Sequence, residues 1–276
     1  MKVTPEVMAQ LESYISDNCT FTLETMRTML SIDMNMQLST STISRHLRGM
    51  TYTVKQVRIE PMTCNNLANR TKRQIFAKAL KKHQQDGDFV VYFDETNYNV
   101  FCKRGRGRAK KDTRATLMLP PSKGANLQVQ CAVNSDTGVL LYKLERGSVR
   151  MEQNAAFIDA TYATIKASPV FNENYGGKKI VVVLDNAPAH RQTEERVTPH
   201  DDLVLLRLAP YSPMCNPIEG CFSVLKAHTW LWIAKQFSTA QTCMKYITPT
   251  VVTKMELHAR DSVNAAEAMA DMIYGA

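Results

Sequence analysis

The feature that most constrains this fold is a short apolar run, Ile180–Leu184, that ends abruptly in an aspartate. Four of its five residues are β-branched, and Asp185 is followed by Asn-Ala-Pro. A short β-branched run bounded by turn-forming residues is typical of a strand buried on both faces. Asp185 then lies at the carboxyl end of that strand, where open α/β sheets bind ligands. The alternative is that Asp185 is only a turn residue.

A second acid, Glu219, is expected after a further strand. Leu203–Leu208 predicts another buried strand, and three prolines between positions 210 and 217 stiffen the connection that follows. Asn216-Pro217 is a strong helix start, with Asn as the N-cap and Pro at the first helical position. Glu219 therefore falls in the first turn of that helix. The alternative is an acid placed there only because it interacts favourably with the helix dipole.

A third acid, Asp94, follows a strand expected at Phe89–Phe93. An acid at a central strand is unfavourable unless something compensates its charge, and a metal ion does so where other acids converge. A hairpin is predicted from Leu127 to Leu144 and a helix from Asn154 to Lys166. The order is strand, hairpin, helix, strand, strand, helix. It indicates an α/β ribonuclease-H-like catalytic domain, a mixed sheet flanked by helices.

The first fifty residues predict three short helices, beginning near Thr4, Thr22 and Ser39. The third ends at Gly49, a common helix stop. Such an all-α unit fits a helix-turn-helix whose third helix enters the major groove of DNA. Hydroxyls and Arg suit phosphates and base edges. The side chains expected to contact DNA are Ser41, Thr42, Ser44, Arg45 and Arg48. The alternative is a small helical bundle with a solvated polar face.

Charge and cysteine usage narrow the class of protein. The chain of 276 residues has a formal net charge of +8, which favours a polyanionic partner such as nucleic acid. Seven cysteines without a Cys-x-x-Cys pair suit a reducing compartment and argue against a disulfide scaffold or a zinc knuckle. No run is apolar and long enough to span a membrane, so no membrane partner is expected.

A basic stretch between positions 103 and 111 is the strongest charge run. It is expected to contact DNA phosphates or to act as a nuclear localisation signal. The alternative is a solvated basic loop. Its cationic residues are Lys103, Arg104, Arg106, Arg108, Lys110 and Lys111.

Three blocks resemble the mariner superfamily of cut-and-paste DNA transposases. They are FDET at Phe93–Thr96, VVLDNAPAH at Val182–His190 and PYSPMCNPIE at Pro210–Glu219. The two later acids are 34 positions apart, close to the spacing that this family keeps. The resemblance covers roughly residues 1 to 230, and the last block is the most specific.

The sequence departs from the family's pattern in three places. Met214-Cys215 stands where Asp-Leu is usual, and Phe222 is the candidate for the aromatic residue that usually follows the Glu. The family generally has two helix-turn-helix units, and this chain resembles a member that lacks the first. The tail after Trp230 is less similar, and a helix is expected there from Ser262 to Ile273.

The resemblance implies a triad of Asp94, Asp185 and Glu219 that binds two Mg²⁺ or Mn²⁺ ions per active site. Two such ions clamp the attacking and leaving oxygens when a DNA phosphodiester bond is cut or joined. Without cations the three carboxylates repel, so the metal-free site is expected to be loose or partly protonated. Glu95 is excluded because neighbouring side chains of a strand point to opposite faces. Asn186 and His190 are expected to orient water or phosphate.

The resemblance also implies partners and an organisation. The partners are double-stranded DNA, as transposon ends and target, and a second copy in a homodimer; the location is the nucleus in a eukaryote. The expected domains are a helix-turn-helix domain (1–50), a linker with a basic helix (51–85), the catalytic domain (86–235) and a C-terminal helical tail (236–276). Two other interpretations stay open, a non-catalytic or domesticated DNA-binding relic and a different ribonuclease-H-like nuclease.

Overall fold

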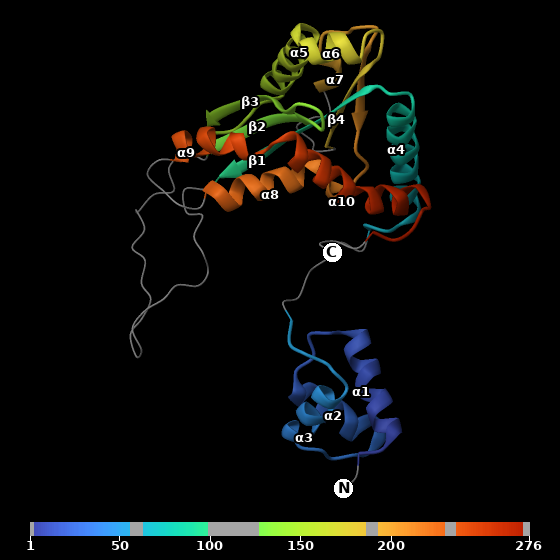
Figure 1. Ribbon diagram of the computed structural model, residues 1–276. Helices are drawn as coiled ribbons and strands as arrows, with labels where there is room; N and C mark the ends of the chain where they lie inside the picture. Colours follow the sequence, from blue (N-terminus) through green and yellow to red (C-terminus); the bar gives the residue numbers. More distant parts are fainter. Residues whose placement is uncertain (1–2, 56–62, 99–126, 186–192, 230–235, 273–276) are drawn as a thin grey trace. The chain divides into compact units, whose positions relative to one another are not determined.

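The chain folds into two compact units, Met1–Glu60 and Pro61–Ala276 (Figure 1). The computed structural model describes residues 3–55, 63–98, 127–185, 193–229 and 236–272. The lysines and arginines of the stretch from 103 to 111 lie outside the described residues, as do Asn186 and His190. Among the helices of the described part, none is both long and apolar enough to cross a membrane.

The first unit is a bundle of three helices around a small apolar core. The helices are α1 (Pro5–Asp17), α2 (Leu23–Met34) and α3 (Thr40–Gly49). α2 and α3 begin where the sequence predicts. Their N-cap residues, Thr22 and Ser39, accept hydrogen bonds from backbone N–H groups of the first turn. The core residues are Val7, Leu11, Tyr14, Met26, Leu30, Leu38, Ile43 and Leu47.

The second unit is built on a five-stranded mixed sheet in the order β3-β2-β1-β4-β5. The strands are β1 (Phe89–Tyr98), β2 (Leu127–Asn134), β3 (Gly138–Arg146), β4 (Ile180–Leu184) and β5 (Leu203–Arg207). β1, β2 and β3 form an antiparallel meander, whereas β4 and β5 run parallel to β1. The expected hairpin is therefore present, and so is the expected order of strands and helices along the chain.

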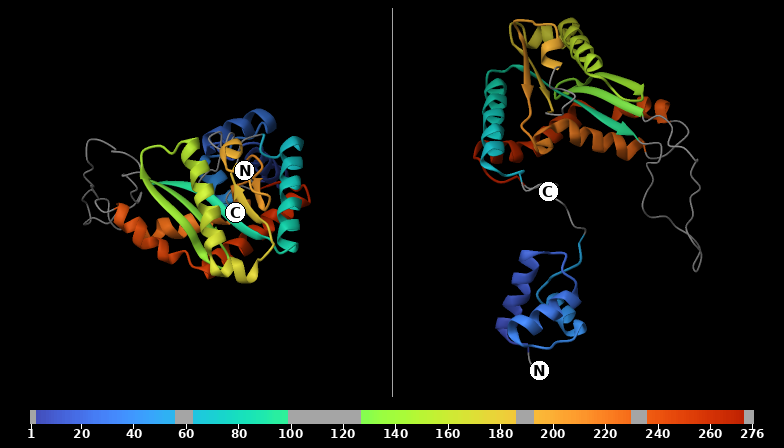
Figure 2. Two further views of the ribbon diagram at one scale, coloured as in Figure 1. Left: turned by 90° about the horizontal axis from the view of Figure 1, so that it is seen from above. Right: turned by 180° about the vertical axis from the view of Figure 1, so that it is seen from behind.

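Helices cover both faces of this sheet (Figures 1 and 2). One face carries α4 (Leu67–Gln85), α8 (Pro217–Thr229), α9 (Gln236–Cys243) and α10 (Pro249–Glu267), and the other carries α5 (Met151–Ala167), α6 (Pro169–Asn174) and α7 (Thr193–Arg196). Alternate residues of β1 serve the two faces. Tyr92 packs in the core with α8, whereas Val91 and Phe93 pack in the core with α5.

The two later strands differ in burial. Every residue of β4 is buried, as its apolar run predicts. The strand expected at Leu203–Leu208 is present as β5, but its five residues are only partly buried. The cause is its position, since β5 is the edge strand of the sheet and lacks a neighbour on one side.

The helix predicted at Ser262–Ile273 has different bounds in the structure. α10 begins at Pro249, after the N-cap Thr248, and ends at Glu267. It packs against α8 and α4, so it belongs to the same unit as the sheet. Lys81 of α4 also forms an ion pair with Glu267. The segment expected as a tail is thus part of the core.

Candidate active site

The sheet places Asp94 and Asp185 side by side. In the parallel pairing of β1 with β4, Tyr92 is opposite Val183. Asp94 lies two residues beyond Tyr92, and Asp185 lies two residues beyond Val183, directly after the end of β4. Because side chains alternate along a strand, both acids are level with each other and on the face that α8 covers.

Glu219 reaches the same place from α8. It is the third residue of that helix, and the neighbouring Ile218 and Phe222 are buried in the core shared with Tyr92. A side-chain hydrogen bond joins Asp94 and Glu219. Three acids from β1, from the end of β4 and from the first turn of α8 therefore converge.

Asp94 is the buried member of this cluster, with 8% of its surface exposed. Burial raises its pKa well above the usual value, and the negative charges of Glu219 and Asp185 raise it further. One opposing contact lowers the pKa, because the backbone N–H of Glu95 donates to Oδ1 of Asp94 at 2.7 Å. That bond also fixes the orientation of the carboxyl group.

Glu219 lies at the open side of the cluster. More than a third of the residue is exposed, yet desolvation by the surrounding protein is the largest cause of its raised pKa, and the charge of Asp185 adds to it. The charge of Lys226 and the hydrogen bond with Asp94 both oppose this rise in pKa. Burial and mutual repulsion thus both favour the protonated forms of Asp94 and Glu219 relative to isolated carboxyl groups.

The donor set fits a divalent metal, although the side chains are not arranged around one. Carboxylate oxygens are the hard ligands that Mg²⁺ prefers. Within the described residues, however, no group of three or more His, Cys, Asp or Glu side chains is placed to hold a metal ion. The raised pKa values of Asp94 and Glu219 have the direction that a partly protonated metal-free site requires, and that expectation stays a prediction.

Two neighbours of the acids behave differently. Glu95 pairs in register with Gln130, whereas Asp94 pairs with Cys131, so the two acids point to opposite faces as expected. α8 begins at Pro217, directly after Asn216, so the helix start that the sequence predicts is confirmed. The side chain of Asn216 does not form the usual capping bond, because Asn216 is 3% exposed and neither polar atom of its side chain has a hydrogen-bond partner within the described structure. Only its backbone carbonyl accepts, from the N–H of Glu219 at 3.2 Å.

Sequence reasoning missed Lys226. It lies seven residues after Glu219, two turns along α8, and therefore on the same side of that helix. Its positive charge lowers the pKa of Glu219. The spacing of seven was a signal in the sequence that could have identified Lys226.

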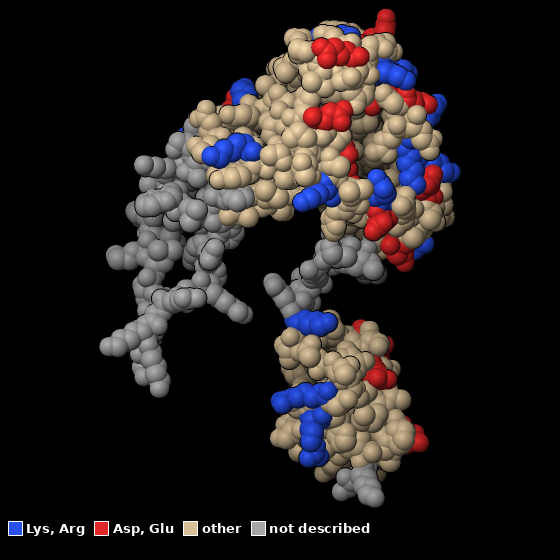
Figure 3. Space-filling model, in the orientation of Figure 1, with Lys and Arg blue, Asp and Glu red and all other residues tan. Residues whose placement is uncertain are grey.

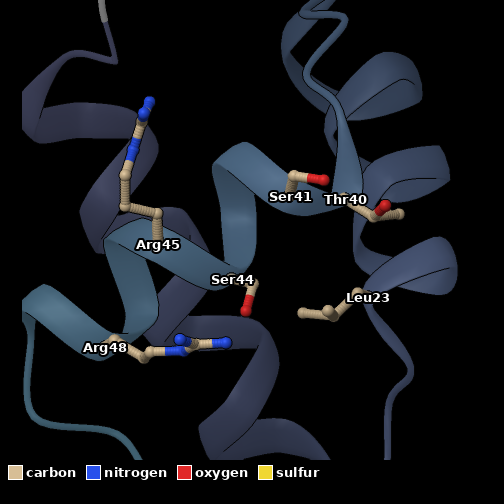
Figure 4. Close-up of a pocket in the computed structure, with 6 residues that line it drawn as sticks. All are labelled: Leu23, Thr40, Ser41, Ser44, Arg45 and Arg48. Carbon is tan, nitrogen blue, oxygen red and sulfur yellow. The ribbon is translucent and has the colours of Figure 1, made fainter.

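The predicted DNA-contacting residues of the first unit lie on α3. Ser41, Ser44, Arg45 and Arg48 line one pocket together with Thr40 and with Leu23 of α2 (Figure 4). The hydroxyl of Thr42 is instead 2.9 Å from that of Ser39 at the start of the helix. Figure 3 shows Lys and Arg gathered on one side of this unit and Asp and Glu on the other. That charge separation suits a polyanion.

The sheet unit matches the model of a known protein family. Residues 89–241, more than half of the chain, match the family model described as DDE superfamily endonuclease. The matched segment contains all three acids. No curated protein matches the sequence.

Solved structures of the Mos1 transposase share the fold. The paired-end complex with the left transposon end has a TM-score of 0.72 at 16% identity, over 99% of this chain and 82% of that one. The mariner paired-end complex with Mn has a TM-score of 0.71 at 16% identity, over 97% and 80%. The complex with Mg has a TM-score of 0.67 at 17% identity, over 97% and 81%. The expected likeness to mariner transposases, with a ribonuclease-H-like sheet, is confirmed at the level of the fold.

Proposed function

Because this chain belongs to the DDE superfamily of endonucleases, we propose that it is a metal-dependent DNA transposase that cuts and joins phosphodiester bonds. The observation that carries the proposal is the convergence of Asp94, Asp185 and Glu219 from three separate elements within the family segment. Burying acids costs free energy, so an apolar cluster would stabilise this open, partly buried site better than three acids do. The three acids therefore indicate a functional role rather than a structural one.

The three carboxylates are the residues that would hold two Mg²⁺ or Mn²⁺ ions. Bound there, such ions would activate the attacking water and stabilise the leaving oxygen of the DNA strand. The residues contribute differently. Asp94 is fixed by its strand and by the N–H of Glu95, and provides a rigid ligand. Glu219 is exposed and adjustable. Lys226 partly offsets the negative charge before a cation arrives. The same site would then let a DNA 3′-hydroxyl attack a target strand.

DNA would be held by both units. The first unit would act as a helix-turn-helix, with α3 as the recognition helix through Ser41, Ser44, Arg45 and Arg48. In the second unit, positions 99–126 contain eight Lys and Arg and one acid, Asp112, which accounts for most of the net charge of +8. Those cations, including Lys103 to Lys111, would neutralise phosphates.

The wider assignments follow from the same proposal. The related Mos1 structures are paired-end complexes, and one of them contains the left transposon end. By analogy, two copies of this chain would pair two DNA ends as a homodimer and act in the nucleus of a eukaryotic cell. Residues 1–50 would form the DNA-binding domain, and the sheet unit the catalytic domain.

The test is cleavage of a labelled DNA duplex in Mg²⁺, in Mn²⁺ and in EDTA. We expect metal-dependent nicking by the wild type and none by Asp185→Asn, with nearly unchanged DNA binding, because only the metal ligand is lost. Asp201→Asn is the matched control, since Asp201 is an exposed acid just before β5. Equal nicking by Asp185→Asn and the wild type would reject the triad. Salt-sensitive DNA binding without any nicking would identify a DNA-binding relic.

A further inference from the structure

Gly220, the residue after Glu219, is a point of close contact between α8 and α10. A Cβ atom built on Gly220 would overlap the sulfur of Met255 and lie 2.9 Å from its Cγ and 3.4 Å from its Cβ. Gly220 lies inside a helix and is not among the glycines with positive φ. Its backbone therefore does not require glycine, and glycine in a helix is less favourable than alanine. The space for Met255 is what requires it.

The next residue of α10 contacts the other element that carries an acid. The hydroxyl of Tyr92 donates a hydrogen bond to the carboxylate of Glu256, and the amide of Gln84 donates to Tyr92. Tyr92 is 1% exposed. It lies on β1 two residues before Asp94, on the same face of the sheet. Met255 and Glu256 thus touch the two elements that hold Glu219 and Asp94.

We propose that α10 is a positioning clamp for the active site, in which Met255 against Gly220 and Glu256 against Tyr92 set the separation of α8 from β1. The inference rests on the proposed function and adds positioning residues to it. Its physical reason is the exposure of Glu219. An exposed side chain is not held by its own packing, so the position of its helix determines where its carboxylate lies.

The geometry of α8 would therefore control metal binding. Ligands for a cation must lie within a few tenths of an ångström of their places, and residues that orient ligands typically change metal affinity by about 10- to 100-fold when mutated. Misplacing a catalytic group by about 1 Å can slow a reaction roughly 100-fold. A larger side chain at position 220 would push α8 away from α10 and move Glu219.

The test exchanges the large side chain between the two helices. Gly220→Leu adds bulk against Met255, and Met255→Ala removes Sδ and Cγ, so the double variant restores room for the leucine. Gly176→Ala is the control, because a Cβ there would meet only the carbonyl oxygen of Asn172 at an ordinary 3.6 Å. Four quantities are measured on the full chain: Mn²⁺ affinity by electron paramagnetic resonance, nicking rate, DNA affinity and Tm.

We expect Gly220→Leu to bind Mn²⁺ about tenfold more weakly and to nick DNA roughly 100-fold more slowly. DNA affinity should be unchanged, and assays run well below Tm separate this effect from unfolding. Adding Met255→Ala should recover most of both losses. Should Gly220→Leu fail to fold, the milder Gly220→Ala with the same rescue is the second variant.

The outcomes separate this inference from the proposed function. If the wild type binds Mn²⁺ through Asp185 and nicks DNA, but folded Gly220→Leu does so equally well, the clamp is rejected and the proposed function stands. Loss of both activities that Met255→Ala does not rescue also rejects the clamp. If the wild type neither binds Mn²⁺ nor nicks DNA, the proposed metal site is rejected together with the inference.

Discussion

Asp94 shows at the scale of one residue how a proposed metal ligand opposes stability. It is buried beside two other acids, and the fold raises its pKa well above the usual value. A group whose pKa is raised by folding stabilises the protein in its protonated form, and that contribution is lost as the pH rises through the folded pKa. As the pH rises above the ordinary pKa of an aspartate, the unfolded chain ionises more readily than the buried Asp94 does, so this residue lowers the stability of the metal-free protein.

Asp94→Asn should make the metal-free protein more stable and inactive. The amide keeps the shape of the side chain and does not ionise. We expect Tm in EDTA to rise by about 2–4 °C, the shift that roughly 1 kcal/mol produces in a chain of this size. Mn²⁺ should raise the Tm of the wild type more than that of the variant. Thermal unfolding with EDTA and with Mn²⁺ measures both, and a lower Tm for the variant in EDTA would contradict the account.

Glu256→Gln should stabilise the protein increasingly as the pH rises. Burial is the main cause of the raised pKa of Glu256, opposed by hydrogen bonds from Tyr92 and Ser135. Below its ordinary pKa of 4.5 the carboxyl group is neutral whether folded or unfolded. As the pH rises through the folded pKa, the wild type must bury a carboxylate and loses stability, whereas the glutamine does not. Urea unfolding at pH 4.5, 6 and 8 would test this, and a difference that is constant with pH would exclude it.

The sequence predicts the positions of the acids better than it predicts the roles of the residues beside them. Asp185 follows a buried β-branched run and Glu219 follows a helix start, so both signals are local. Gly220 and Asn216 could not be assigned in the same way. The role of Gly220 depends on Met255, which lies 35 positions later, and the amide of Asn216 departs from the capping role that its position predicts. Packing partners far along the chain decide both cases.

Among the secondary-structure elements, α10 differs most from what the sequence predicts. Its apolar positions, including Val252, Val263 and Ala266, face the core that contains Phe222. Helical periodicity predicted a helix in the tail, but no local pattern states which neighbour it packs against. The edge position of β5 was missed for the same reason, since strand order is a property of the whole sheet.

Val252→Ala should therefore destabilise the catalytic unit itself. Val252 is fully buried against the sheet core. Removing two methyl groups from such a position costs about 2 kcal/mol, through lost burial and a residual cavity. The control is Lys254→Ala, an exposed position on the same helix. Urea unfolding followed by far-UV circular dichroism should show one destabilised transition for Val252→Ala alone. A stable sheet with only the last helix melting early would mean that α10 is a separate tail.

At the scale of the whole molecule, the proposed DNA binding by α3 and the proposed chemistry lie in two separate units. The sequence predicts the order of the strands and helices along the chain and a mixed sheet flanked by helices, because strand, hairpin and helix patterns are local. It does not predict that α4 and α10 join the sheet unit, since their packing depends on long-range contacts such as the ion pair between Lys81 and Glu267. DNA binding by α3 and chemistry at the three acids should accordingly be separable.

Replacing Arg45 and Arg48 together with alanine should weaken DNA binding without changing the metal site. Each phosphate contact contributes about 0.9 to the slope of log affinity against log salt, so two lost contacts should lower the slope by about 1.8. Arg27→Ala is the control, because Arg27 is already paired with Glu24 on the same helix. DNA affinity across a salt series measures the slope, and Mn²⁺ affinity checks the second unit. An unchanged slope would remove α3 from the DNA interface.

The most direct test of the central claim is to locate manganese in crystals of the protein bound to DNA. The account predicts anomalous density for two ions about 4 Å apart, contacted by carboxylate oxygens of Asp94, Asp185 and Glu219. Crystals of Asp185→Asn should lose that density and keep the fold. Manganese bound elsewhere, or density at the site that survives the substitution of Asp185, would contradict the assignment of the three acids as a metal-dependent DNA-cutting centre.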